Sequence, residues 1–231
     1  MDAVVMAGGK GTRLRPLTYA IPKPLLPVGE KPILEILLGQ LKSSGCTRAY
    51  VSIGYKGDLI RSYVGDGSRL GLAVEYVEEP EALGTAGALA LIKDRLTAPF
   101  LMVNGDILTK LDFARFYSTH VSEGAAMTVG CIEYTVQIPY GVVEHKDGVV
   151  LGIKEKPTAS YLVAAGIYAL SPDALSAVKT AERLDVPDLM SGLVREGKKV
   201  ISHRITEPWL DVGKMSDYEK AMQEVASWGG I

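Results

Sequence analysis

The sequence predicts an α/β fold in which a mostly parallel sheet lies between helices, and three observations support this. Short apolar runs alternate with helical patterns roughly every twenty residues through the first half of the chain, as in β-α-β units. The 231 residues, 47% of them hydrophobic, are enough for one large domain. After residue 133 the rhythm breaks into β-rich runs around an Asp-Gly turn, which indicates a small antiparallel insertion.

The first half of the chain supplies four predicted strands, at 3–6, 49–53, 72–77 and 100–103. Between them, apolar residues at helical spacing predict helices at 31–44, 59–64 and 89–96. Ligands of open α/β sheets bind beyond the carboxyl ends of the strands. Loops follow three of the strands at such ends, at 8–13, 79–87 and 104–106, and we expect them to form one site.

The second half of the chain mixes antiparallel strands with helices. A strand is expected at 125–133, and the runs 139–144 and 149–154 flank Asp147-Gly148, a strong hairpin signal. A long apolar strand follows at 162–170, and a shorter one is predicted at 199–205. Helices are expected at 111–123, from Ser171-Pro172, at 185–195 and at 216–227, the last with a capping box of Ser216 and Glu219.

Composition excludes several classes of function. A net charge of −2 gives no general attraction to nucleic acid or to acidic membranes, and no apolar run is long enough to span a bilayer. The N-terminus does not resemble a signal peptide, and Cys46 and Cys131 lack metal-site spacing, so reduced cysteines and a cytoplasmic location are expected. His120, His145 and His203 are dispersed, and we interpret them as ordinary surface or loop residues.

A glycine-rich loop follows the first strand, in the order Gly8-Gly9-Lys10-Gly11-Thr12-Arg13. Glycines let backbone approach a ligand closely, and their N–H groups can point at anionic oxygens. The loop is not a P-loop, and Leu14 stands where a dinucleotide fingerprint needs its third glycine. With Lys10, Arg13, Arg15 and Lys23 close by in sequence, the stretch favours a polyphosphate site over a plain glycine-rich surface loop.

The segment from Gly8 to Thr18, followed by Pro22-Lys23-Pro24, resembles the signature of the sugar-1-phosphate nucleotidyltransferases. These NDP-sugar pyrophosphorylases join an NTP to a sugar 1-phosphate and release pyrophosphate. The resemblance implies a Rossmann-like, glycosyltransferase-A-like fold with the antiparallel insertion over the sugar site. It implies that Arg13 and the loop hold the triphosphate and that Lys23 supports the reacting phosphates. The implied nucleotide-binding residues are Ala7, Gly8, Gly9, Gly11, Thr12, Arg13, Leu83, Gly84, Thr85, Asn104 and Gly105.

Two carboxylates resemble the metal ligands of this family. Asp106 comes directly after a buried strand, where an aspartate often only caps a turn. Asp211, within Trp209-Leu210-Asp211-Val212-Gly213, resembles the family's late W-x-D-x-G element. Magnesium takes hard oxygen ligands and needs only one or two carboxylates beside water and phosphate oxygens. The resemblance therefore implies Mg²⁺ on Asp106 and Asp211, with Arg13, Lys23 and Asp106 as the catalytic residues.

The base and the sugar are less sharply indicated. The run from Leu83 to Leu89 resembles guanylyltransferases acting on mannose-type or heptose phosphates, and no glutamine typical of uridylyl or thymidylyl members lies at 79–88. The sugar-phosphate residues implied by the resemblance are Tyr140, Gly141, Glu155, Lys156 and Gly166. Ala164 replaces an asparagine that contacts the sugar in many members, which disfavours an N-acetylated sugar.

The predicted organisation is one nucleotidyltransferase domain over 1–231, with 1–132 mainly binding nucleotide and 133–231 mainly binding sugar. The expected substrates are an NTP, GTP in the first place, and a sugar 1-phosphate, without nucleic acid or membrane partners; a homodimer is left open. The alternatives are a UTP-, CTP- or dTTP-using enzyme and a non-catalytic nucleotide-sugar-binding regulatory subunit on the same fold.

Overall fold

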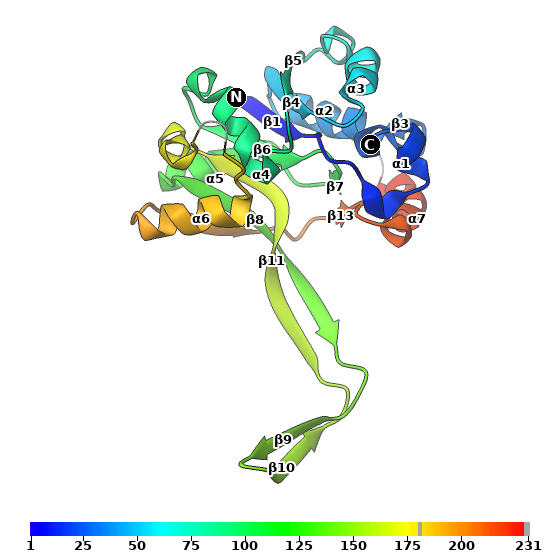
Figure 1. Ribbon diagram of the computed structural model, residues 1–231, viewed down its shortest axis with the longest axis vertical. Coiled ribbons are helices and arrows are strands. Elements are labelled where there is room, and N and C mark those ends of the chain that lie inside the picture. Colours follow the sequence, from blue (N-terminus) through cyan, green and yellow to red (C-terminus); the bar gives the residue numbers. More distant parts are fainter. Residues whose placement is uncertain (180–181, 229–231) are drawn as a thin grey trace.

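A computed structural model describes residues 1–179 and 182–228 of the chain. Its centre is a seven-stranded sheet in the order β12-β8-β11-β6-β1-β4-β5 (Figure 1). Within this sheet β11 runs antiparallel to β6 and β8, and the other pairings are parallel. The strands are β1 (Asp2–Met6), β4 (Arg48–Ile53), β5 (Ala73–Glu78), β6 (Phe100–Asn104), β8 (Met127–Gln137), β11 (Thr158–Leu170) and β12 (Val200–Arg204). The predicted α/β class with a mostly parallel sheet is confirmed.

Helices lie on both faces of the sheet (Figure 1). The α-helices are α1 (Leu17–Ala20), α2 (Ile33–Ser43), α3 (Gly57–Val64), α4 (Gly84–Gly87), α5 (Phe113–Glu123), α6 (Val186–Arg195) and α7 (Met215–Glu224). Shorter 3₁₀ turns are η1 (Thr12–Leu14), η2 (Lys23–Leu25), η3 (Ser68–Leu70), η4 (Ala88–Leu91), η5 (Lys93–Arg95), η6 (Pro172–Ala177) and η7 (Val225–Trp228). Among the described residues, no helix is both long and apolar enough to cross a membrane.

Three local predictions were wrong. The helix expected from Ser171-Pro172 is the 3₁₀ turn η6, and Ser171 does not cap it, because its hydroxyl donates to the carbonyl of Ala125. The helix expected at 89–96 is replaced by the turns η4 and η5, and Ile92 between them leaves helical geometry, with φ of −131° and ψ of 5°. Leu89 and Ile92 are nevertheless buried, so two tight turns satisfy the apolar spacing. The last helix begins one residue earlier than expected, and the carboxylate of Asp217, not Glu219, accepts the backbone N–H of Lys214 at 3.1 Å.

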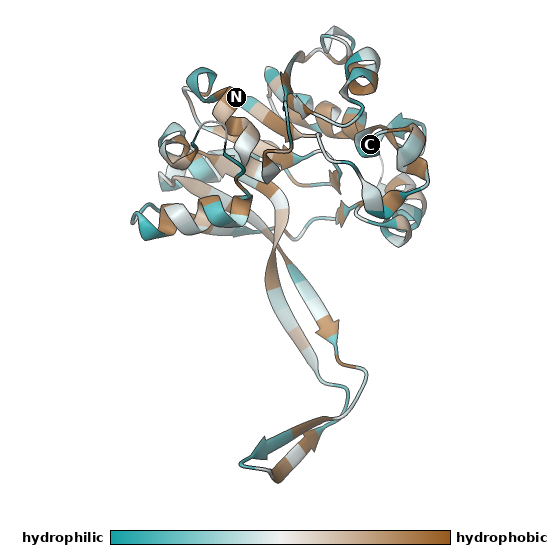
Figure 2. Ribbon diagram, viewed as in Figure 1, coloured by the Kyte–Doolittle hydropathy of each residue, from teal (hydrophilic) through white to brown (hydrophobic). Residues whose placement is uncertain are grey.

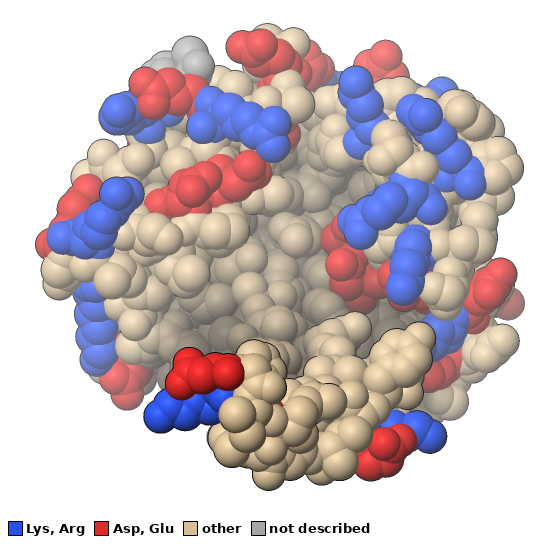
Figure 3. All heavy atoms as spheres, turned by 60° about the horizontal axis from the view of Figure 1, so that its bottom comes forward, with Lys and Arg blue, Asp and Glu red and all other residues tan. Residues whose placement is uncertain are grey.

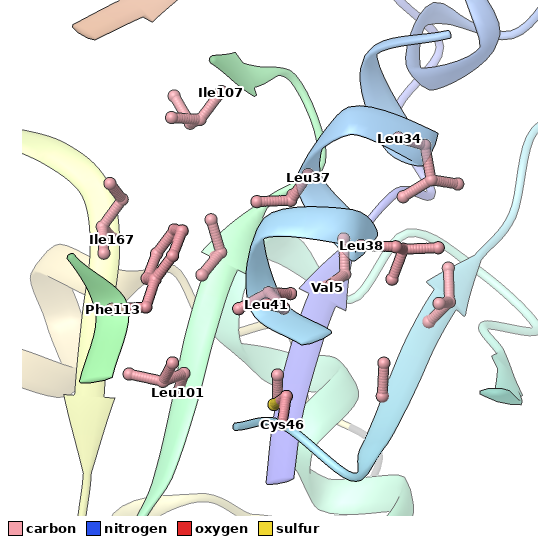
Figure 4. Packing of buried hydrophobic residues seen from close by; sticks show 14 of the residues in the cluster. Val5, Leu34, Leu37, Leu38, Leu41, Cys46, Leu101, Ile107, Phe113 and Ile167 are labelled. Carbon is pink, nitrogen blue, oxygen red and sulfur yellow. The ribbon is translucent and has the colours of Figure 1, made fainter. Parts of the chain in front are cut away.

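The main core lies between the sheet and α2. Leu34, Leu37, Leu38 and Leu41 of α2 share one face of the helix, at the spacing that predicted it, and they point at the strands (Figure 4). Each of them is fully buried, and burial of such a side chain stabilises the fold by roughly 1.5–3 kcal/mol. A second core lies on the opposite face, under α6 and the 3₁₀ turns.

Short strand pairs complete the body. They are β2 (Pro27–Val28) with β3 (Lys31–Pro32), and β7 (Ile107–Thr109) with β13 (Trp209–Asp211). The second pair joins the segment after β6 to the C-terminal part of the chain. It matters for function because both predicted metal ligands lie at its end.

β8 and β11 continue well beyond the sheet as a two-stranded ribbon (Figure 1). At its far end is a hairpin of β9 (Val142–Lys146) and β10 (Val149–Lys154). Its turn is the predicted Asp147-Gly148, with φ of 49° and 82°, the left-handed geometry that Asp-Gly favours. The hairpin is confirmed, but it projects away from the body and does not cover a site there. We call residues 132–163 the arm.

The histidine interpretation was wrong for His120. Its ring is fully buried, with Nδ1 2.8 Å from the hydroxyl of Thr128 and Nε2 3.0 Å from that of Ser171. Ser171 donates its own proton to the carbonyl of Ala125, so it accepts from Nε2–H of a neutral ring. His203 is half-buried and packs edge-on against Phe116, whereas His145 is exposed on the arm.

Candidate nucleotide and metal site

Three loops meet at the carboxyl ends of β1, β5 and β6, as the sequence predicted for this kind of sheet. The N–H of Gly105 donates to the carbonyl of Met6 at 2.9 Å, which ties the loop after β6 to the loop after β1. A Cβ on Gly8 would lie 2.9 Å from a carboxylate oxygen of Glu79, and one on Gly105 would lie 3.0 Å from the oxygen of Met6. Glycine at both positions therefore permits the close approach.

The loops enclose a pocket of about 310 Å³. Figure 3, which looks at the molecule from the arm's end, shows a hollowed surface with charged side chains of both signs around it. Its lining residues are Met6, Ala7, Gly8, Gly9, Lys23, Pro24, Glu79, Ala82, Gly84, Thr85, Asn104, Gly105, Asp106, Arg183 and Asp185. Backbone N–H donors, a lysine and carboxylates thus share one cavity.

Gly11 fixes the position of Lys23. It has φ of +58°, and a Cβ there would lie 2.9 Å from the methyl group of Thr18 and 3.1 Å from Cβ of Lys23. The hydroxyl of Thr18 donates to the carbonyl of Gly11 at 2.8 Å, which closes the loop onto α1. Lys23 is held in η2 between two prolines and is buried, with its ammonium group at the pocket.

Asp106 and Asp211 meet at this ammonium group. Nζ of Lys23 forms an ion pair with Oδ2 of Asp106 and lies 3.9 Å from Oδ1 of Asp211. The backbone brings the carboxylates together, because Val212 N–H donates to the carbonyl of Asp106 at 3.1 Å. Burial and the neighbouring carboxylate of Asp106 raise the pKa of Asp211 above its ordinary value, while Lys23 and Arg13 oppose the rise.

These side chains fit a magnesium ion. Oδ1 of Asp106 and Oδ1 of Asp211 are buried, and neither has a hydrogen-bond partner in the described part of the chain. Buried carboxylate oxygens without partners are costly unless something satisfies them. The described residues hold no cluster of three or more His, Cys, Asp or Glu side chains suited to a metal. Two carboxylates are still sufficient for magnesium, which takes its other ligands from water and phosphate.

The other end of the pocket is built from the loop after β5 and the start of α6. Gly84 has φ of +83°, and a Cβ there would lie 2.6 Å from the carbonyl of Leu184. Asp185 accepts the N–H of Thr85 at 3.0 Å, and Glu79 accepts the N–H of Leu83 at 3.0 Å. The Thr85 N–H is the main cause that lowers the pKa of Asp185, with help from Arg183 and against burial.

Comparison with known proteins identifies the family behind this geometry. The family described as nucleotidyl transferase matches residues 2–227. The chain belongs to this family. The resemblance to sugar-1-phosphate nucleotidyltransferases is thereby confirmed at the level of the family.

Two curated relatives illustrate the range within the family. A UTP--glucose-1-phosphate uridylyltransferase of Synechocystis sp. is 32% identical over 98% of this chain and 64% of its own length. A mannose-1-phosphate guanylyltransferase of Mycobacterium tuberculosis is 32% identical over 97% of this chain and 64% of its own length. This nucleotidyl transferase chain therefore spans about 64% of the length of these curated relatives.

Solved structures match over nearly their whole length. HddC from Yersinia pseudotuberculosis complexed with GMP-PN has a TM-score of 0.75 and 26% identity, covering 97% of this chain and 99% of that one. A putative glucose-1-phosphate thymidylyltransferase from Bacillus anthracis has a TM-score of 0.78 and 26% identity, covering 96% and 94%. The relatives thus agree on the fold and differ in the nucleotide that their names give.

The structure of this nucleotidyl transferase places most predicted nucleotide residues together. Those that line the pocket are Ala7, Gly8, Gly9, Gly84, Thr85, Asn104 and Gly105. Leu83 is buried behind it, and Gly11 supports Lys23. Thr12 opens the turn η1, and Arg13 in the same turn lies near Asp211 and Gly213 at the rim.

The predicted sugar residues are brought together with one another but not with this pocket. A Cβ on Gly141 would lie 3.1 Å from a carboxylate oxygen of Glu155, so Tyr140, Gly141, Glu155 and Lys156 form one cluster where the ribbon passes into the β9–β10 hairpin. Gly166 is the exception, because it stays in the body. A Cβ there would lie 2.7 Å from the amide nitrogen of Asn104.

Sequence reasoning missed Glu79, Arg183 and Asp185 as pocket residues. Glu79 was part of a predicted loop but received no role, and Asp185 was taken only as the start of a helix. Asp185 is separated from Thr85 by a hundred positions, and only the folded packing of Leu184 against Leu83 and Ala86 joins them. No local pattern signals a contact of that range.

Proposed function

We propose that the protein transfers a nucleotidyl group from an NTP, GTP in the first place, to a sugar 1-phosphate of the mannose or heptose type. The observation that carries the proposal is the pair of buried carboxylate oxygens on Asp106 and Asp211 that lack a hydrogen-bond partner among the described residues, beside Lys23 and the glycine-rich loop. Such a site can place a polyphosphate and its counter-cation at one point. Family membership supports the same reaction.

In the proposed reaction an oxygen of the sugar phosphate forms a bond to the α-phosphorus of the NTP. The bond from that phosphorus to the β-phosphate oxygen breaks, and pyrophosphate leaves with the electron pair. The attacking group is already an anion, so the protein needs no covalent nucleophile and works by positioning and charge neutralisation. Magnesium held by Asp106 and Asp211 supplies positive charge to the phosphate oxygens when it is bound.

The chain's own groups have distinct roles in this scheme. The N–H groups of the Gly8–Gly11 loop hold the β- and γ-phosphates, with Arg13 at the rim. The ammonium group of Lys23 offsets negative charge that builds up at the α-phosphorus. The proximity of Lys23 to both carboxylates orients its ammonium group in the pocket.

Guanine is favoured by the acceptors at the far end of the pocket. Asp185 places a carboxylate there, and guanine presents two adjacent donors, N1–H and the N2 amino group, to an acceptor. A uracil or thymine ring offers only one such N–H. Relatives named as mannose-1-phosphate guanylyltransferases at 31–32% identity, and HddC in complex with GMP-PN, support the same base.

A matrix of the four NTPs against several sugar 1-phosphates, scored by pyrophosphate release with magnesium, tests the proposal. We expect the highest kcat/KM for GTP with mannose 1-phosphate or a heptose 1-phosphate. The Asp106→Ala variant, purified in parallel, controls for contaminating activity and should stay silent. No release with any pair would overturn the proposed reaction, whereas highest activity with UTP or dTTP would overturn only the base.

Asp185→Asn sharpens the test of the base. Asparagine keeps the side-chain oxygen that accepts from Thr85 but loses the charge and half of the acceptor capacity. We expect the preference for GTP over UTP to fall at least tenfold, while turnover with saturating GTP changes less. An unchanged ratio would show that Asp185 does not contact the base.

A further inference from the structure

The arm carries a strip of apolar side chains that no described residue covers. In the ribbon, Tyr134 lies directly opposite Tyr161, and Val136 lies opposite Ala159. Residues opposite each other in an antiparallel pair point to the same face, so these side chains share one face. The opposite face is mostly polar, with Thr135 beside Ser160 at 3.1 Å between their hydroxyl oxygens, although Leu162 also lies on it. This alternation is typical of a ribbon with one buried face.

The arm exposes more apolar surface than is usual for a monomeric protein. Tyr134 and Tyr161 are 56% and 58% exposed, and Figure 2 shows separate brown segments in the ribbon and in the hairpin. The large apolar residues exposed along the arm are Tyr134, Val136, Ile138, Tyr140, Val143, Val149, Val150, Leu151, Ile153, Tyr161 and Leu162.

Summed over both faces of the arm, these residues expose on the order of 1,000 Å², so much of the arm's surface is apolar. That area is about what each partner contributes to a standard protein interface, roughly 800 Å². An isolated two-stranded hairpin is only marginally stable in water, so the arm itself needs a covering surface.

The cluster of predicted sugar residues identifies what covers it. Lys156 and Glu155 lie at the outer end of the ribbon, and Gly166 of the same strand lies beside Asn104 in the body. Eight residues of extended strand separate Thr158 from Gly166, about 25 Å at 3.3 Å per residue. A lysine side chain cannot bridge that span. The pocket of one copy is therefore left without the groups on its own arm.

We propose that the arm is exchanged between two copies of this chain, so that Tyr140, Glu155 and Lys156 of one copy complete the sugar-phosphate side of the other copy's pocket. The apolar face of each arm is buried against the second copy. Exchange of an identical element between protomers gives a closed two-fold dimer at low cost. The trans site rests on the proposed function, whereas the dimer does not.

The geometry of the strand suits such an exchange. The register of β11 against β8 shifts between Ala164 and Tyr168, around Gly166, which has φ of +70°. The ribbon leaves the sheet at this irregularity, so its direction is set by a few residues. The two copies then each contribute a glycine loop and carboxylates to one site and an arm to the other.

The first experiment measures mass in solution. Light scattering after size exclusion should give twice 24.8 kDa for the wild type. Tyr161→Lys places a charge on the apolar face and should yield monomers. Its matched control, Ser160→Lys on the neighbouring position of the polar face, should leave the dimer intact. A monomeric wild type, or two lysine variants that behave alike, would overturn the proposal whether or not the protein is an enzyme.

The second experiment asks which copy completes a site. Asp106→Ala lacks a body group and Lys156→Ala lacks an arm group, and we expect each homodimer to lose at least 90% of pyrophosphate release. Heterodimers co-expressed with two tags hold one complete site of two, and should recover about half of the wild-type activity. No recovery, or a fully active Lys156→Ala protein, would contradict the trans site.

A third experiment is independent of catalysis. Ala82 is exposed at the pocket rim, and both native cysteines are buried. Ala82→Cys in one tagged copy and Lys156→Cys in the other should be joined by a short bismaleimide into a covalent dimer carrying both tags. If the pair reacts only when both cysteines are in one chain, the arm folds back over its own pocket and the exchange is refuted.

Discussion

Asp211 stands opposite Ile107 in the antiparallel pair of β13 and β7, and this register sets its carboxylate beside that of Asp106. The two residues are distant in sequence, and three backbone positions of β13 hold the relationship. Each aspartate presents a buried oxygen that lacks a hydrogen-bond partner within the described part of the chain, and Lys23 is the cation between the two carboxylates. The site can therefore accept further positive charge. Metal binding, turnover and stability, measured with and without a divalent cation, test this arrangement.

Loss of either carboxylate should abolish metal binding and turnover. We expect Asp106→Ala or Asp211→Ala to lower kcat at least a hundredfold, since one electrostatic contact to a transition state typically accounts for about 3–4 kcal/mol. Calorimetric titration with Mn²⁺ in the presence of nucleotide should show the lost binding directly. Asp94→Ala, an exposed carboxylate in η5, is the matched control. Retained metal affinity in both site variants would place the ion elsewhere.

Arg13→Ala should act on the triphosphate without changing the fold. The guanidinium lies at the rim near Gly213 and opposes the rise that burial and Asp106 cause in the pKa of Asp211. We expect kcat to fall at least a hundredfold, with an unfolding midpoint close to that of the wild type. An assay of pyrophosphate release measures kcat, and urea unfolding measures the midpoint separately. Near-normal turnover would remove Arg13 from the proposed machinery.

Removal of Lys23 should destabilise the metal-free protein more than the metal-bound one. Lys23→Met leaves two carboxylates facing each other without a counter-ion, at an expected cost of about 1–3 kcal/mol. A divalent cation restores positive charge, so the rise in Tm on adding Mg²⁺ should be larger in the variant than in the wild type. Lys199→Met, which breaks a half-exposed pair with Glu123, should show no such difference. Equal magnesium shifts in all three proteins would contradict the arrangement.

Gly84→Ala should damage the base end of the pocket. The left-handed φ of +83° is unfavourable for alanine, and the added Cβ meets the carbonyl of Leu184 at 2.6 Å and a carboxylate oxygen of Asp185 at 2.8 Å. We expect a loss of more than about 1 kcal/mol in the free energy of unfolding and a raised KM for NTP. Gly192→Ala in α6, where a Cβ meets nothing within 4 Å, should be neutral or stabilising by about 1 kcal/mol. Similar losses in both variants would show that the close contact is not the cause.

The sequence was sufficient for features that arise from local patterns. Apolar periodicity located the strands and most helices, and the rule for the carboxyl ends of strands placed the Gly8, Gly84 and Gly105 loops at one pocket. The segment at 89–96 shows where this fails. Its buried leucine and isoleucine satisfy the helical pattern, yet the helical geometry breaks at Ile92 and the segment forms two 3₁₀ turns.

Long-range packing could not be predicted in the same way. Asp185 reaches the pocket because the chain at Leu184 forms backbone hydrogen bonds with Leu83 and Ala86, and nothing near Asp185 in sequence indicates those partners. The arm is similar, because its strands were expected but their direction away from the body depends on the irregularity at Gly166. His120 was misjudged because its two hydroxyl partners, Thr128 and Ser171, come together only in the fold.

His120 should make the stability of the fold depend on pH. Burial lowers the pKa of its imidazole below the ordinary 6.5, although the carboxylate of Asp173 opposes the shift. Below about pH 6.5 the unfolded chain therefore binds more protons at this ring than the folded protein does, and the free energy of unfolding falls as the pH drops. Above that pH both states are neutral, and this contribution to stability is fully present. Histidine titrates in the range from about pH 8 to about pH 5. Urea unfolding at several pH values in this range measures the slope with which the free energy of unfolding depends on pH.

His120→Gln should flatten that slope, even though it also lowers stability at pH 8 by disturbing the hydrogen bonds to Thr128 and Ser171. Part of the slope should remain, because burial also lowers the pKa of His203. His145→Gln is the matched control, since this exposed ring on the arm should leave the slope of the wild type unchanged. A His120→Gln protein that loses stability toward acid as steeply as the wild type would show that the buried ring accepts its proton without cost, contrary to the packing around it.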